Sequence, residues 1–358
     1  MSRADRLAER VAERELDALL VTELYNLRWL TGFTGTNGLA LVGAGPDGLR
    51  RFATDFRYVE QAADEVSGFE RTRAPQELLE AVRDSLPDDV NRLGFDDAHL
   101  TVKQHARLRA LVPDDVELVA AGGLLERERA IKEPGELERI RAAAALADDA
   151  LRELLEEGLA GRTERALARA LEDAMRRRGA SAPSFPSIVA AGAHGALPHA
   201  QPRNVPVATG TLVVIDWGAL LDGYCSDCTR TLATGELEGE ARETYELVLR
   251  AQQAALDAVA PGPLGREIDA VAREIIEEAG HGERFGHGLG HGVGLEVHEG
   301  PRLSRLGEEA LVPGNVVTIE PGVYVPGRFG VRIEDLAVVT GEGHEVFSAF
   351  PKELTFVD

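Results

Sequence analysis

The sequence predicts a two-domain α/β protein with a mixed first domain and a duplicated second domain. Its length of 358 residues suits about two domains. Strand and helix patterns alternate over the first third, and the remainder repeats one helix–helix–strand pattern at a constant spacing. A change to strongly helical composition near residue 130 divides the chain into predicted domains at 1–130 and 131–358.

Short patterns define the elements of the first domain. Apolar runs rich in Leu and Val are typical of strands, and the sequence Gly-Pro-Asp-Gly at 45–48 predicts the turn of a hairpin. The predicted elements are, in order, a strand at 16–22, hairpin strands at 39–42 and 51–54, helices at 56–66 and 75–85, and a strand at 92–95. The pair Gly122-Gly123 then interrupts the pattern, and helical composition begins at Ile131.

The second domain contains two copies of one pattern. Residues 210–218 and 314–322 both read Gly-x-x-Val-x-Ile-acid-x-Gly, and Gly-x-x-Gly-Arg turns at 158–162 and 262–266 keep the same offset. Each of these turns separates two amphipathic helices, predicted at 136–156 and 163–178 in one half and at 240–259 and 267–279 in the other. If the halves pack about a pseudo-two-fold axis, their two acid-bearing strands face each other.

Composition limits the classes of partner. The net charge is −22, from 61 acidic and 39 basic residues. This balance argues against DNA, RNA and anionic membranes as partners, because each requires a basic surface. No apolar run approaches the roughly 20 residues needed to span a bilayer, and the charged segment 1–14 lacks the apolar core of a signal peptide. We therefore expect a cytoplasmic protein.

The chain has two cysteines, Cys225 and Cys228, and so no disulfide framework. A Cys-x-x-Cys pair alone is compatible with half a zinc site or with a redox couple. The run 221–234 predicts a strand, on which positions three apart point to opposite faces. Cys225 would then share a face with Asp227, and Cys228 would not. We interpret the cysteines as structural thiols and Asp227 as the functional residue between them.

Four acids occupy matched positions in the two halves. Asp216 ends an apolar strand, where a charge is costly unless it is paired or bound to a metal. A turn at 221–223 would bring Asp227 to the same side, and Glu320 and Glu334 repeat this arrangement around a turn at 326–327. Carboxylates crowded in this way repel one another, and a bound dication is the natural compensation.

Four of the nine histidines lie in one glycine-rich segment, 281–299. Glycines there allow the backbone to approach a ligand closely. With His291 of this segment, the four acids form the ligand set that two divalent ions require. His199 precedes the first acidic strand and would face the same cleft, whereas the sequence leaves the role of His194 open.

The motifs that carry these residues resemble those of the proline-specific metallopeptidases of the pita-bread fold, a family that includes aminopeptidase P, prolidase and, more distantly, methionine aminopeptidase. The resemblance covers about 131–358 and includes every ligand, and the first domain is similar to the creatinase-type N-terminal domain of this family. The implied fold is a creatinase-like mixed α/β N-terminal domain plus a duplicated pita-bread α/β catalytic domain. The motifs are His199, Asp216-x-Gly, Ser226-Asp227-x-Thr-Arg-Thr, Gly286-His-Gly-x-Gly-His291-Gly-x-Gly-x-x-x-His298-Glu, Glu320-Pro-Gly-x-Tyr324 and Val331-Arg-Ile-Glu334-Asp.

The resemblance implies a role for each metal ligand. Asp216 would bind one ion, Asp227 and Glu334 would bridge both ions, and His291 with Glu320 would complete the second. A metal-bridging hydroxide would attack the scissile carbonyl, because a bound dication lowers the pKa of water from about 15.7 to about 7. The oxygen-rich ligand set suits Mn²⁺, with Zn²⁺ or Co²⁺ as alternatives.

The same resemblance implies roles in substrate binding and proton transfer. Glu320 would shuttle a proton, while His199 and His298 would hydrogen-bond the substrate and the tetrahedral oxyanion. Three further residues would line the specificity side of the cleft, namely His287, Tyr324 and Arg332.

Two features bear on the length of the substrate. The motif Asp55-x-Arg57-Tyr58 is similar to one of small bacterial aminopeptidase P enzymes, which implies a part in substrate binding; the alternative is a local salt bridge beside a packed ring. Arg302 is placed like an arginine that grips the C-terminal carboxylate of a dipeptide in prolidase-like relatives. Because no inserted loop closes the primed side, we favour aminopeptidase P over Xaa-Pro dipeptidase.

The resemblance therefore implies a metallo-aminopeptidase with two divalent ions per subunit that acts on peptides with proline in the second position. An Xaa-Pro dipeptidase is the alternative. A non-catalytic binding module on the same fold is disfavoured, because all five ligand positions are filled. The resemblance also implies a homodimer, in which the first domain of one subunit forms part of the cleft wall of the other subunit.

Overall fold

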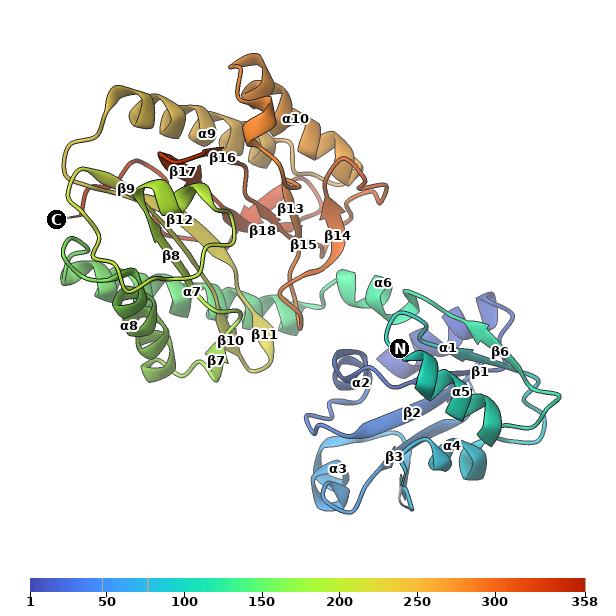
Figure 1. The fold of residues 1–358 in the computed structure, drawn as a ribbon. Coiled ribbons are helices and arrows are strands. Elements are labelled where there is room, and N and C mark those ends of the chain that lie inside the picture. The colour runs from blue at the N-terminus through green and yellow to red at the C-terminus, as the bar shows by residue number, and fades with distance from the viewer. Residues whose placement is uncertain (47, 76, 358) are drawn as a thin grey trace. The chain divides into compact units, whose positions relative to one another are not determined.

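The structure, a computed structural model, describes every residue except Asp47, Gln76 and Asp358. These three fall in the predicted turn at 45–48, in the predicted helix at 75–85 and at the end of the predicted second domain, so those parts of the predictions lie outside the described residues. The chain divides into two compact units, Met1–Arg129 and Ala130–Asp358 (Figure 1).

The first unit is built on a six-stranded mixed sheet with the order β4-β3-β2-β1-β5-β6. Every residue of the central strands β1 and β2 is buried, whereas β4 at the edge is mostly exposed. The strands are β1 (Ala18–Val21), β2 (Gly38–Gly43), β3 (Arg50–Thr54), β4 (Glu70–Arg73), β5 (Arg92–Phe95) and β6 (Glu117–Ala120). The predicted strand at 16–22, the hairpin and the strand at 92–95 are confirmed.

The helices of the first unit differ more from prediction. They are α1 (Arg3–Glu13), α2 (Leu24–Thr31), α3 (Val59–Glu65), α4 (Glu80–Ser85), α5 (Val102–Leu111) and α6 (Leu124–Ala130). The helix predicted at 56–66 starts late because Asp55 Oδ1 accepts the N–H of Arg57 (2.8 Å), which holds a turn in front of α3. The helix predicted at 75–85 is reduced to α4.

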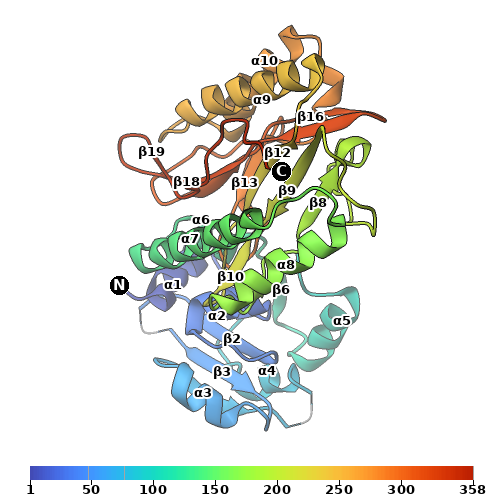
Figure 2. The ribbon, with the colours of Figure 1, turned by 90° about the vertical axis from the view of Figure 1, so that its left-hand side faces the viewer.

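The second unit contains the four predicted helices, which are confirmed. They are α7 (Pro134–Glu156), α8 (Glu164–Arg177), α9 (Gly239–Asp257) and α10 (Gly265–Glu278). Helix α7 packs beside α8, and α9 packs beside α10 (Figure 2). Gly161 and Gly262, in the turns between the paired helices, have positive φ angles of 78° and 112°, which glycine adopts at little cost.

The strands of the second unit form two matched sets. One sheet has the order β12-β9-β8, and the other has the order β14-β13-β15-β18-β19. Smaller sheets join β11-β10-β7 and β16-β17. The elements are β7 (Ala182–Pro183), β8 (Ile188–Ala191), η1 (Gly192–Ala196), β9 (Thr211–Trp217), β10 (Ala219–Leu221), β11 (Tyr224–Cys225), β12 (Cys228–Thr234), η2 (Gly282–Arg284), β13 (Gly290–Gly292), β14 (Glu299–Leu303), β15 (Val316–Ile319), β16 (Gly322–Val325), β17 (Phe329–Arg332), β18 (Asp335–Val339) and β19 (His344–Val346).

The prediction of one continuous strand at 221–234 is wrong. Asp222 and Gly223 turn the chain with φ angles of 49° and 84°, so β10 and β11 form a tight hairpin. The strand then breaks at Ser226, whose Oγ accepts the N–H of Ala219 (2.9 Å). A Cβ at Gly218 would lie 2.0 Å from the carbonyl oxygen of Ser226, so this close approach requires glycine. The alternation of faces therefore does not run through Asp227.

Among the described residues, no helix combines the length and the apolar character that crossing a bilayer requires.

Candidate metal centre

The five predicted ligands line one cleft of the second unit, with a volume of about 430 Å³. The predicted residues His199, His287, His298 and Arg332 line the same cleft. Apolar side chains make up much of the remaining wall. They are Phe185, Pro186, Ile188, Pro198, Ala200 and Pro202.

Three of the carboxylates come from strands and from the breaks beside them. Asp216 lies on β9 opposite Thr229 of β12, and Asp227 occupies the break before β12. Glu334 follows β17, and its N–H donates to the carbonyl of Thr229 (3.1 Å). One carboxylate oxygen of each acid lies within 4.8 Å of the others. Pairing between the two halves thus gathers acids that are distant in sequence.

His291 on β13 presents a nitrogen lone pair to two of the acids. Its Nδ1 lies 3.1 Å from the carbonyl oxygen of Gly292, and because a carbonyl only accepts, Nδ1 carries the proton. In the neutral ring, Nε2 faces Glu320 Oε1 at 3.3 Å and Asp227 Oδ2 at 3.6 Å. A neutral ring in this position would repel both acids, so Nε2 must carry a metal cation or a proton; burial lowers the pKa of His291, but the hydrogen bond and charge of Glu320 outweigh burial and raise it.

Buried carboxylate oxygens without hydrogen-bond donors also indicate that the site requires a cation. Asp216 Oδ1 and Glu334 Oε1 are buried and accept no hydrogen bond from the described residues. Burial, and then the negative charge of neighbouring acids, raises the pKa of Asp227 and of Glu334 well above the ordinary range. Four carboxylates and one imidazole are the donors that divalent ions such as Mn²⁺ and Zn²⁺ accept. The residues therefore fit a pair of divalent cations.

Glu320 has a different electrostatic environment from the other acids. Burial raises its pKa, but the hydrogen bond and charge of His291 outweigh burial and lower the pKa to about 2. Thr318 Oγ1 also donates to Glu320 Oε1 (3.1 Å). Glu320 is thus ionised at neutral pH.

Arg332 and Thr229 hold the acids in place. Arg332 Nη2 donates to Asp216 Oδ2 (2.6 Å), and its Nε donates to Thr229 Oγ1 (3.0 Å). Thr229 Oγ1 in turn donates to Glu334 Oε2 (2.7 Å). No role was predicted for Thr229, although it lies in the same motif as Asp227. Its position opposite Asp216 becomes evident only from the register of β9 and β12.

A chain of hydrogen bonds fixes the tautomer of His287. Its Nδ1 donates to the carbonyl of Gly288 (2.8 Å), so its Nε2 accepts from the hydroxyl of Tyr324 (3.0 Å). That hydroxyl accepts from Arg332 Nη1 (2.9 Å). Burial lowers the pKa of His287, consistent with a neutral ring. Tyr324 is buried behind His287 rather than being part of the cleft surface.

His298 lies beside the metal ligands. Its ring centroid is 4.3 Å from that of His291, in an edge-on arrangement. Burial, followed by the positive charge of His291, lowers the pKa of His298. A neutral His298 offers one N–H donor to a substrate carbonyl.

The segment that carries His199 is clamped on both sides by one buried acid. The carboxylate of Glu164, at the start of α8, accepts from His194 Nδ1 (3.0 Å). It also accepts from the backbone N–H (2.9 Å) and the Nη2 (3.0 Å) of Arg203. Between these anchors, the carbonyl of Pro198 accepts from Arg332 Nη1 (3.1 Å). The sequence left His194 open and did not identify Glu164, because neither contact is local in the chain.

Besides Tyr324, four predicted substrate-binding residues are not among the described residues that line the cleft. Arg302 is exposed on β14 and is not among the described residues that line the cleft. Asp55, Arg57 and Tyr58 belong to the first unit. Arg57 pairs with Asp55 (2.8 Å), and its guanidinium lies 5.3 Å from the ring centre of Tyr58. These contacts are compatible with the expected local salt bridge beside a packed ring, and a part of the three residues in substrate binding stays a prediction.

Both cysteines are free and buried. The thiol of Cys225 donates to the carbonyl of Leu295 (3.8 Å), and that of Cys228 donates to the carbonyl of Glu334 (3.5 Å). Burial raises the pKa of Cys225 to about 12 and also raises the pKa of Cys228. Their different partners and their burial agree with the interpretation as structural thiols.

Comparison with known proteins covers nearly the whole chain. Residues 138–341 match metallopeptidase family M24, and residues 3–131 match the creatinase/prolidase N-terminal domain. The chain is 41% identical to the uncharacterized peptidase YqhT of Bacillus subtilis (strain 168) over 340 residues, or 95% of each protein.

Solved structures agree with this assignment. An Xaa-Pro dipeptidase from Bacillus anthracis has 39% identity and a TM-score of 0.95, covering 99% of both chains. An X-Pro aminopeptidase from Thermotoga maritima MSB8 has 34% identity and a TM-score of 0.87, covering 97% of this chain and 99% of that one. The predicted creatinase-like and pita-bread fold is thus confirmed, as is the prediction of an enzyme. The chain belongs to metallopeptidase family M24 and is a peptide hydrolase.

Proposed function

We propose that this enzyme removes the N-terminal residue from peptides that have proline in the second position, as an aminopeptidase P does. The supporting observation is the lining of the cleft. Of the described lining residues, Arg332 alone carries a fixed positive charge, and its donors are used by Asp216, Tyr324, Thr229 and Pro198. A free C-terminal carboxylate would find no uncommitted guanidinium there, whereas a longer peptide needs none.

The substrate bond explains why histidine donors are needed. The amide before proline is tertiary and has no N–H of its own, so recognition falls on its carbonyl. His199 and His298 lie in the cleft wall, where an N–H of each is available to the carbonyl oxygen as it gains negative charge. The clamp of Glu164 holds the segment of His199 and so limits the conformational entropy that this segment loses on substrate binding.

Metal binding is assigned to Asp216, Asp227, His291, Glu320 and Glu334, with Mn²⁺ as the proposed ion. When bound, a pair of divalent ions would lower the pKa of a water molecule toward neutrality and would also polarise the scissile carbonyl. Glu320, in the cleft wall, would accept a proton from the attacking water and return it to the departing proline nitrogen. Tyr324, through His287, and Thr229 fix the directions of the groups around this centre.

A dipeptidase is the second candidate. It is favoured by the similarity to the Xaa-Pro dipeptidase from Bacillus anthracis, with a TM-score of 0.95 and 39% identity. Under this alternative, a group that lies outside the described cleft lining would have to bind the free carboxylate of the dipeptide. Arg302 is the predicted residue for that contact.

A direct comparison of substrates tests the proposal. Hydrolysis of Ala-Pro and of Ala-Pro-Ala should be measured with the same enzyme in Mn²⁺. We expect kcat/KM to be at least tenfold higher for the tripeptide. A clear preference for the dipeptide would favour the second candidate, and cleavage of neither would contradict both.

Arg302→Ala provides the matched variant. We expect it to leave tripeptide cleavage unchanged, because its side chain does not line the cleft. A loss confined to dipeptide cleavage would assign the carboxylate contact to Arg302 and would support dipeptidase activity.

A further inference from the structure

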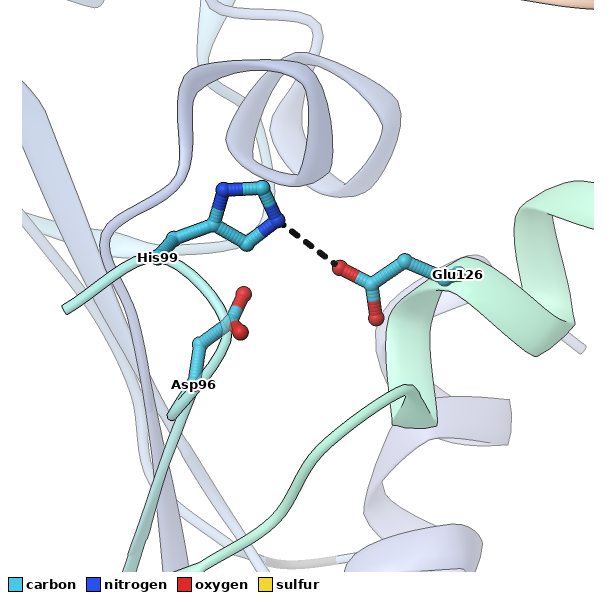
Figure 3. A group of neighbouring side chains, drawn as sticks. All are labelled: Asp96, His99 and Glu126. Atoms are coloured by element: carbon cyan, nitrogen blue, oxygen red, sulfur yellow. Dashed lines mark ion pairs between the residues drawn. The ribbon is translucent and has the colours of Figure 1, made fainter. Parts of the chain in front are cut away.

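The first unit contains a second group of potential metal ligands. Asp96 directly follows β5, His99 lies in the connection to α5, and Glu126 lies on α6 (Figure 3). One ligand atom of each residue lies within 4.8 Å of the others. His99 Nε2 is 3.7 Å from Glu126 Oε1. This group is formed entirely within Met1–Arg129 and shares no residue with the cleft described above.

Asp96 supplies an independent indication of a ligand. It is only 6% exposed, and its Oδ1 is buried and accepts no hydrogen bond from the described residues. Figure 3 shows the carboxylate of Asp96 directed toward the space between the ring of His99 and the carboxylate of Glu126. A buried carboxylate oxygen without a partner is unfavourable, so an occupant of this space would relieve a real cost.

The side chain that donates to both acids carries no charge. Asn26 Nδ2 donates to Asp96 Oδ2 (3.1 Å) and to Glu126 Oε1 (2.6 Å), but an amide carries no net charge. The nearby guanidinium of Arg129 donates to Asn26 Oδ1 (2.8 Å) and also faces a third acid, Glu23, at 3.9 Å.

We propose that Asp96, His99 and Glu126 bind one divalent transition-metal ion such as Zn²⁺. One imidazole nitrogen and two carboxylates are ligands that zinc accepts. Ligand atoms around tetrahedral zinc lie roughly 3.3 Å apart at bond lengths of about 2.0–2.1 Å, so the 3.7 Å separation of His99 and Glu126 needs only a small adjustment. The side chain of His99 is 37% exposed, which gives the ion a route from solvent and room for a water ligand.

Such an ion would connect two parts of the first unit. Asp96 and His99 belong to the β5–α5 connection, and Glu126 belongs to α6. Binding would therefore fix the start of α6 against the end of β5. This role is separate from peptide hydrolysis and does not depend on the proposed substrate.

The number of zinc ions bound per chain tests the proposal. Full-length, chelator-treated protein with Asp227→Asn, which should abolish metal binding in the cleft, should be titrated with Zn²⁺ in competition with a chromophoric chelator. We expect one zinc ion per chain, and none in Asp227→Asn with His99→Ala. Equal zinc binding with and without His99→Ala would overturn the proposal.

Further variants separate a metal site from a simple ion pair. Glu126→Gln should weaken zinc binding at least tenfold, whereas Glu128→Gln on the same helix should not, because Glu128 pairs with Arg10 (2.8 Å) instead. In otherwise native enzyme, His99→Ala should leave Mn²⁺-dependent peptidase activity unchanged. If Glu126→Gln and Glu128→Gln bind zinc as tightly as the native chain, the group is only a hydrogen-bonded network and the proposal fails.

Discussion

At the residue scale, the environment of each acid decides whether it attracts a metal ion or a proton. Glu320 keeps its charge because His291 is adjacent, whereas Asp227 and Glu334 are pushed toward protonation by burial and by neighbouring acids. A bound dication would lower the pKa of Asp227 and of Glu334 again, because it supplies a positive charge next to them. The differences in pKa thus describe a site prepared for cations.

Asp227→Asn should abolish metal binding in the cleft and turnover together. The amide keeps the shape of the side chain but removes the charge at the most crowded position of the cluster. Residues that only orient metal ligands cost about 10–100-fold in affinity or activity when changed, so loss of a ligand should exceed about 100-fold. Metal content by elemental analysis and kcat measure the two effects. Asp222→Asn, in the turn of the same hairpin, is the control, and normal turnover by Asp227→Asn would contradict its role.

Thr229→Val should weaken metal binding without removing a ligand. The hydroxyl links Arg332 to Glu334, and valine cannot replace either hydrogen bond. We expect a loss of about 10–100-fold in metal affinity, measured by competition with a chelator. Thr234→Val is the matched control, because Thr234 lies on the same strand but donates to Ala208 (2.7 Å). Equal affinities of the two variants would remove Thr229 from the site.

The sequence was informative about which residues could form the metal site and less informative about their supports. Asp216, Glu320 and their counterparts stand out because a charge within an apolar strand is rare and the pattern recurs in both halves. Their assignment as ligands stays a prediction. Thr229 and Glu164 could not be recognised, because their significance depends on strand register and on contacts between distant segments.

At the element scale, interruptions of regular structure are as important as the strands themselves. The break at Ser226 was not predicted, because the apolar and β-branched residues on both sides favour a continuous strand. Tertiary contacts prevail there: Ser226 bonds to Ala219, and its backbone packs against Gly218. The four long helices of the second unit were predicted well, since long amphipathic patterns depend little on distant contacts.

Glu164→Gln should destabilise the protein in a pH-dependent manner. Burial raises the pKa of Glu164, but hydrogen bonds from Arg203 and Ala191 outweigh it and lower the pKa below its ordinary value. The charge therefore stabilises the fold above the unfolded pKa of about 4.3, and this contribution is lost as pH falls through the lower folded pKa. We expect the variant to lose about 1–3 kcal/mol at pH 7, and less as the pH falls below about 4.

Urea unfolding at pH 7 and at acidic pH measures this difference. Asp173→Asn is the control, because Asp173 lies on the same helix and its side chain is 65% exposed. A constant difference between Glu164→Gln and the native chain at all pH values would show that the charge of Glu164 is not responsible.

At the scale of the whole molecule, the chain is strongly acidic, and four of its acids line one cleft. The family and fold were predictable because the motifs extend over the whole second unit. The preferred length of the substrate was harder to predict from the sequence. It depends on whether Arg302 lies in the cleft, which only the three-dimensional structure shows. The homodimer remains a prediction.

Removal of metal should lower thermal stability. An ion present at about 100 times its dissociation constant stabilises the folded state by about 2.7 kcal/mol, which corresponds to roughly 5–10 °C in the Tm of a unit of this size. Calorimetry with and without EDTA measures the shift. Asp227→Asn should reduce it, and an unchanged Tm on chelation would argue against metal binding in the cleft.

Because Cys225 and Cys228 are buried, their reaction with a thiol reagent can report when the native chain unfolds. A thiol-reactive dye should leave the folded enzyme unlabelled, since neither sulfur is accessible or ionised at neutral pH. Both sulfurs lie in Ala130–Asp358, and Met1–Arg129 contains no cysteine. The rate of dye incorporation should therefore time the unfolding of the catalytic unit alone, without any engineered label.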